Sequence, residues 1–177
     1  PYDLQSQYYA TYTRGEYDHE PVLRYIDSEV PIAFLVTDHG DRNRINACAA
    51  NSYSISYEPR NFKGHLNEFP RILEYGQKVD KLRKRYEDFL WNGEFLDILG
   101  AKVTGKNIKH TVFRNKSTGK KAVVVYNADM KNANAASVTL EGSTNSLIMV
   151  SPENLTPRKF DGNVVIASQS LVVIMEN

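Results

Sequence analysis

The stretch Tyr53-Ser54-Ile55-Ser56-Tyr57-Glu58-Pro59 decides the fold, because it predicts a short buried strand that carries a carboxylate at its C-terminal end. A helical pattern from about Arg71 to Trp91 follows it. Upstream, Pro31-Ile-Ala-Phe-Leu-Val-Thr-Asp-His-Gly40 repeats this design before a helical pattern from Arg42 to Ala50. Two consecutive strand-then-helix units predict a parallel sheet, as in an α/β barrel, where catalytic acids lie at the C-terminal ends of the strands.

The predicted long helix is amphipathic. Its apolar positions recur at steps of three and four residues, at Ile72, Leu73, Tyr75, Val79, Leu82, Tyr86, Phe89 and Leu90. Basic residues fill much of the remainder, but acidic residues are interleaved with them. The charged face is therefore expected to be a solvated outer surface rather than an anion-binding patch.

After Gly100 the pattern changes to two-residue alternation with frequent turn residues. The predicted strands are His110–Arg114, Lys121–Asn127, Ser137–Glu141, Ser146–Ser151, Thr156–Phe160, Asn163–Ala167 and Leu171–Glu176. Turns at Asn115–Gly119 and Asp161-Gly162 are expected to close hairpins. Seven short strands of this spacing predict an antiparallel β-sandwich.

The expected fold class is therefore α/β plus all-β: the partial end of a (β/α) barrel followed by an antiparallel β-sandwich. Residues 1–100 are expected to be the C-terminal segment of a (β/α)8 barrel and residues 101–177 the sandwich, with residues 93–106 as the linker region. Two βα units leave a parallel sheet with open edges. Either the missing strands come from a larger polypeptide of which this chain is the tail, or the two strands are extended by something that the sequence does not show. The chain opens on Pro1 without methionine, and we expect it to be a processed or excised piece.

Composition excludes several classes of function. The 177 residues are 41% hydrophobic and 24% charged, typical of a globular protein, and the net charge of +1 does not favour a nucleic-acid partner. No apolar run approaches the roughly 20 residues that span a membrane. Cys48 lies in an apolar stretch and is expected to be a small buried side chain. No histidine pair has the spacing of a metal site, and we expect neither metal nor cofactor.

Five segments together resemble a known family: Arg24-Tyr25, Asn46-Ala47, residues 54–58, residues 66–70 and residues 81–97. They resemble the last part of TIM-barrel glycoside hydrolases, in particular large bacterial glycosidase-like proteins of largely unassigned activity. In that family a final helix with a Leu-Arg-x-x-Tyr-x-x-x-Leu-x-x-Gly-x-Phe-x-Asp pattern leads into a C-terminal β-sandwich. The resemblance covers roughly residues 20–100 by motif and the rest by architecture.

This sequence departs from the family pattern at Asp27-Ser28-Glu29, where Phe-Pro-Glu is usual, and this weakens any role for Glu29. The resemblance implies a carbohydrate substrate and an exported, secreted or periplasmic, bacterial protein. It also implies that the remainder of the barrel, from upstream polypeptide, completes the active site.

Glycoside cleavage uses two carboxyl groups that face each other across the bond, and Asp38 and Glu58 are the catalytic candidates. His39 and Arg60 are expected to bind sugar hydroxyls, and Tyr57 to offer an apolar face to a sugar ring. Structural alternatives stay open for these residues. Asp38 is alternatively the N-cap of the following helix, and Glu58 alternatively forms an ion pair with Arg60. His39 is alternatively a loop residue without a functional role.

Two other functions remain open. The chain is alternatively a non-catalytic carbohydrate-binding module that uses the tyrosines between Tyr8 and Tyr17, or a structural accessory domain without a ligand. Trp91 is expected to pack where the barrel segment meets the sandwich.

Overall fold

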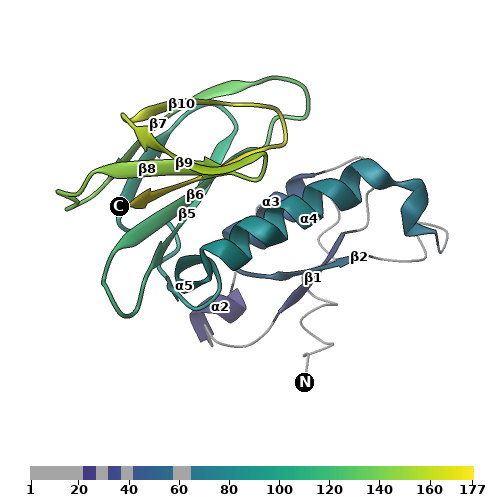
Figure 1. The fold of residues 1–177 in the computed structure, drawn as a ribbon, viewed down its shortest axis with the longest axis horizontal. Coiled ribbons are helices and arrows are strands. Elements are labelled where there is room, and N and C mark those ends of the chain that lie inside the picture. The colour runs from purple at the N-terminus through teal and green to yellow at the C-terminus, as the bar shows by residue number, and fades with distance from the viewer. Residues whose placement is uncertain (1–21, 27–31, 37–41, 58–64) are drawn as a thin grey trace.

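The computed structural model describes residues 22–26, 32–36, 42–57 and 65–177. In these residues a parallel pair of strands with its helices precedes an antiparallel sandwich (Figure 1). The α/β plus all-β class predicted from the sequence is confirmed.

The α/β part contains two parallel strands joined by a helix. Its elements are α2 (Val22–Ile26), β1 (Ala33–Val36), α3 (Asn43–Ala50), β2 (Ser54–Tyr57), the 3-10 helix η1 (Leu66–Glu68), α4 (Pro70–Arg85) and α5 (Glu87–Leu90). The register of β1 with β2 runs from Ala33 opposite Ser54 to Val36 opposite Tyr57. The two strand-then-helix units expected from the sequence are thus present.

The long helix is interrupted once. Pro70 occupies its first turn, where a missing N–H costs nothing. The expected single helix to Trp91 is wrong, because the backbone leaves the helical region at Tyr86, with φ −119° and ψ 39°, before α5 begins. The Tyr86 ring packs against the apolar core. The apolar spacing continues across this break, which is why periodicity does not reveal it.

The all-β part forms two antiparallel sheets. Its strands are β3 (Glu94–Phe95), β4 (Ala101–Thr104), β5 (Ile108–Arg114), β6 (Lys121–Asn127), β7 (Asn134–Leu140), β8 (Leu147–Ser151), β9 (Asn154–Phe160), β10 (Asn163–Ile166) and β11 (Leu171–Glu176). Six strands pair in the order β3-β5-β6-β11-β8-β9, and three in the order β10-β7-β4. All seven predicted strands are present, with small shifts at their ends.

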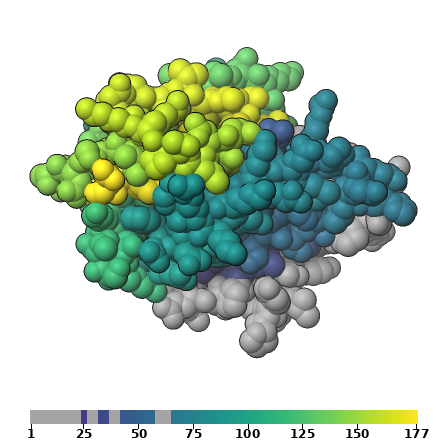
Figure 2. Space-filling view, viewed as in Figure 1, coloured from purple at the N-terminus to yellow at the C-terminus, as the bar shows by residue number. Residues whose placement is uncertain are grey.

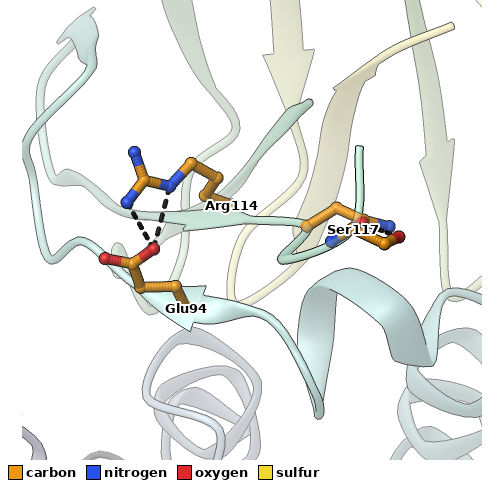
Figure 3. Close-up of polar contacts among 4 residues, drawn as sticks. Glu94, Arg114 and Ser117 are labelled. Carbon is orange, nitrogen blue, oxygen red and sulfur yellow. Dashed lines mark hydrogen bonds and ion pairs between the residues drawn. The ribbon is translucent and has the colours of Figure 1, made fainter. Parts of the chain in front are cut away.

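Two strands lie in the region that the sequence assigned to a linker. β3 pairs with β5, and β4 pairs with β7. The Arg114 guanidinium donates to Glu94 Oε2, with Nε at 2.8 Å, and this ion pair joins β5 to β3 (Figure 3). Both strands are short, so the alternation that marks longer strands is weak in them.

The two predicted turns have different outcomes. The hairpin between β5 and β6 is confirmed: Asn115 Oδ1 accepts hydrogen bonds from the Ser117 and Thr118 amides, both at 2.9 Å. The hairpin at Asp161-Gly162 is wrong, because β9 belongs to the six-stranded sheet and β10 to the three-stranded one. Gly162, at φ 103°, instead carries the chain from one sheet to the other.

The central strands β6 and β11 of the six-stranded sheet are buried on both faces. In β6, Val123 and Val125 pack toward the three-stranded sheet, whereas Ala122, Val124 and Tyr126 belong to a second cluster with residues of α3 and α4. Figure 1 shows these helices between the sandwich and the β1–β2 pair, and Figure 2 shows continuous packing between the parts. The parts therefore share one core, and a domain boundary near residue 100 stays a prediction.

None of the helices in the described ranges is long and apolar enough to cross a membrane.

Candidate functional site

The carboxyl ends of β1 and β2 define the candidate site. The strands run in the same direction and their last residues, Val36 and Tyr57, are register partners, so the chain leaves both strands at one edge. We call this edge the strand rim. Four predicted site residues follow it along the chain but lie outside the described residues: Asp38, His39, Glu58 and Arg60. Their predicted roles are taken up as a proposal below.

Tyr57 lies on the helix side of β2. A Cβ placed on Gly76 of α4 would lie only 2.1 Å from Tyr57 Oη, so the hydroxyl sits directly against the helix backbone. Burial, with smaller contributions from Asp80 and Cys48, raises the pKa of Tyr57 to about 12. The neutral ring therefore fixes β2 to α4. This placement gives no support to the expectation that Tyr57 offers its face to a sugar.

The opposite face of β2 carries small polar residues. Because side chains alternate along a strand, Ser54 and Ser56 point away from the side that Ile55 and Tyr57 share. Both serines are half-buried. This face of β2 therefore offers hydroxyl groups rather than a packed apolar surface.

A buried polar network fixes the helix that follows β1. Tyr75 Oη of α4 donates to Asn46 Oδ1 at 2.5 Å, and Asn46 Nδ2 donates to Asn43 Oδ1 at 3.3 Å. Asn43 Nδ2 then donates to the Ala128 carbonyl at 2.9 Å, just beyond β6. Burial raises the pKa of Tyr75, so its hydroxyl stays a donor. The network joins α3 to both α4 and the sandwich.

Arg42 anchors the start of α3 by a separate route. Its amide donates to Gln169 Oε1 at 2.8 Å, and its guanidinium carbon lies 4.6 Å from the centroid of the Tyr75 ring. The loop between β1 and α3 therefore ends on a segment held by the sandwich. Sequence reasoning missed these anchors. The available signal was the pair Asn43 and Asn46 in a helix otherwise rich in apolar residues.

The other end of the strands is held by Arg24, one of the residues that carry the family resemblance. Its guanidinium donates to the carbonyls of Asn51, at 2.9 Å, and Ser52, at 2.5 Å. It also lies 5.3 Å from the centroid of the Tyr53 ring. Through these contacts Arg24 holds the turn between α3 and β2 in place.

The sequence led us to expect Trp91 where the barrel segment meets the sandwich, but its contacts are with β2 and α4. It lines a surface pocket with Ser54 and Ile55 of β2 and with Asp80 of α4. Its ring stacks on the buried Arg83 guanidinium, and 38% of the residue is exposed. The tryptophan therefore belongs to the outer side of β2.

Cys48 is fully buried, and burial raises the pKa of its thiol to about 12. Over the described ranges, no three histidine, cysteine, aspartate or glutamate side chains come close enough to hold a metal ion.

The fold of the chain is similar to that of solved structures. No family model and no curated protein matches the sequence. Among solved structures, the crystal structure of a GH30 endoxylanase from Clostridium papyrosolvens C71 is similar at 12% identity and a TM-score of 0.48. The similarity covers 89% of this chain and 45% of the endoxylanase, so the chain spans less than half the length of that protein.

Proposed function

We propose that the chain is the C-terminal portion of a glycoside hydrolase that acts on O-glycosidic bonds of a carbohydrate. The observation that carries the proposal is the parallel register that ends at Val36 and Tyr57. Asp38 and Glu58 follow these two residues along the chain by two positions and one position. Acids that follow neighbouring parallel strands suit a shared pocket.

In the proposed reaction one carboxyl group donates a proton to the glycosidic oxygen as the bond to the anomeric carbon breaks. The other, as a carboxylate, attacks the anomeric carbon or takes a proton from the attacking water. His39 and Arg60 are proposed to bind hydroxyl groups of the sugar. Upstream strands of the same polypeptide would complete the site, so the isolated chain is expected to be inactive.

Substitution in a longer polypeptide that contains the upstream strands tests this proposal. We expect Asp38→Asn and Glu58→Gln each to lower glycoside hydrolysis by about 10²-fold or more, because each removes an ionisable group from the reaction. Glu74→Gln, at an exposed position of α4, is the matched control and should leave the rate unchanged. Full activity of both rim variants toward every glycoside that the parent cleaves would contradict the proposal.

A glycan array probed with the isolated chain separates the non-catalytic alternative. A carbohydrate-binding module retains glycan binding without the upstream strands. If the array shows binding and the longer polypeptide hydrolyses nothing, the module is the better description.

A further inference from the structure

Arg83 is a buried cation without a hydrogen-bond acceptor in the part of the chain that the structure describes. Its side chain is fully buried on α4, and none of its three guanidinium nitrogens donates a hydrogen bond there. Asp80 Oδ1 lies 3.6 Å from Nη1, beyond hydrogen-bond length, and the Asp80 side chain is 55% exposed. The Trp91 ring covers the guanidinium, with its centroid 3.5 Å from Cζ.

Such a group is costly to bury. Arginine has five N–H donors and stays charged at neutral pH, even though burial lowers the pKa of Arg83 to about 10. Buried charges in proteins are usually paired and hydrogen-bonded. Among the described residues Arg83 therefore has one long ion pair, with the exposed Asp80, and no hydrogen-bond acceptor for its guanidinium.

The outer edge of β2, the one opposite β1, lies near this cation. The Ser54 amide donates to the Ile32 carbonyl at 2.8 Å, toward β1. Successive amides of a strand point to opposite sides, so the Ile55 amide points away from β1, where none of the described strands pairs with β2. A pocket of about 360 Å³ borders this edge. It is lined by Ser54, Ile55, Asp80, Lys84, Glu87 and Trp91.

We infer that a third parallel strand, from the same polypeptide upstream of Pro1, pairs with the outer edge of β2 and brings a carboxylate to Arg83. The inference rests on the proposed function, since both require the longer polypeptide. Strand addition satisfies the backbone groups of the edge, and the carboxylate satisfies the buried guanidinium. A second copy paired through β2 would bring the same buried cation instead of an anion.

The test compares the direction in which one substitution shifts the midpoint of urea unfolding in two chains. In the 177-residue chain, Arg83→Met removes a charge that has no hydrogen-bond acceptor among the described residues, and the midpoint of urea unfolding should rise. In the longer polypeptide the same substitution leaves the incoming carboxylate buried without its cation, and the midpoint should fall. Lys81→Met, at an exposed position of the same helix, is the control and should shift neither midpoint. A shift of the same sign in both chains would overturn the inference.

Hydrogen exchange gives a second readout that needs no variant. The Ile55 amide should exchange quickly in the 177-residue chain and become protected in the longer polypeptide. The Ser54 amide, already bonded to Ile32, should be protected in both. Fast exchange of the Ile55 amide in the longer polypeptide would contradict the inference. Protection of this amide in the shorter chain through self-association would contradict it as well. Neither readout uses hydrolysis, so a polypeptide that passes both but cleaves no glycoside contradicts the proposed function alone.

Discussion

At Gly76, α4 has no room for a side chain on the face that meets β2. A Cβ there would overlap Tyr57 Oη at 2.1 Å and would lie 3.5 Å from Ile45 Cδ1. Glycine is about 1 kcal/mol less favourable than alanine inside a helix, so an unobstructed position would gain from alanine. The close approach of β2 to the helix therefore outweighs helix propensity at this residue.

We expect Gly76→Ala to lower the free energy of unfolding by about 1–3 kcal/mol, because the Tyr57 ring must move within a packed core. Urea denaturation measures the change. Adding Tyr57→Phe removes the overlapping oxygen, and the double variant should recover part of the loss. A Gly76→Ala chain more stable than the parent would show that the ring moves freely.

The reactivity of the Cys48 thiol tests whether this side chain is buried. Burial raises the pKa of its thiol to about 12, so the reactive thiolate is scarce at pH 8 in the folded chain. We expect an aromatic disulfide reagent to leave Cys48 unmodified at pH 8 until the chain unfolds. The same reagent with the urea-unfolded chain is the control. Rapid labelling of the folded chain would contradict the buried position.

Among the elements, the β5–β6 hairpin depends on a side chain rather than on a two-residue turn. Asn115 is buried, and its Oδ1 accepts from the amides of Ser117 and Thr118 and from Ser117 Oγ. We expect Asn115→Ala to lower the free energy of unfolding by about 1–3 kcal/mol, since two loop amides lose their acceptor. Ser117→Ala removes only the hydroxyl and should cost less in the same urea measurement. Equal losses would mean that the amide bonds contribute little.

The elements also show what a sequence pattern can predict. β6 and β11 have the predicted bounds, because their apolar runs are long and bounded by polar residues. β4 has four residues, of which Lys102 and Thr104 are exposed, and this leaves too little pattern to detect. The residues Asp161-Gly162 predict a turn, because turn preferences are local. They do not predict that β10 leaves the sheet of β9, because that depends on strands distant in the chain.

For the whole molecule, the shared core predicts a single unfolding transition. Ile72 and Val79 of α4 belong to the same buried cluster as Val124 and Val173 of the sandwich. We expect fluorescence of Trp91, the one tryptophan, and far-UV circular dichroism of the sheets to change at the same urea concentration. Two separate transitions would instead support independent domains that meet near residue 100.

The parallel strand pair at the candidate site was predictable from the sequence, whereas the side chains that hold α3 in place were not, and the roles of the acids stay a prediction. Acids after two parallel strands locate the strand rim, since strand direction follows from the strand-then-helix order. The anchors of α3 were not predictable, because Asn43 and Arg42 bond to Ala128 and Gln169, far along the chain. Pairings of this kind arise from tertiary packing and leave no periodic signal.

Helix α3 has no face in contact with water, since every residue from Asn43 to Ala50 is buried, and the apolar cluster that it joins includes residues of β6 and of its neighbour β11. During synthesis the ribosome makes this helix long before Leu171–Glu176 leaves the exit tunnel. Until then its apolar side chains and asparagines have no complete partner surface, and the nascent segment is open to chaperones and to aggregation. Loss of the final strand would therefore expose a helix near the opposite end of the sequence, and a chain truncated before Leu171 should accumulate as insoluble protein.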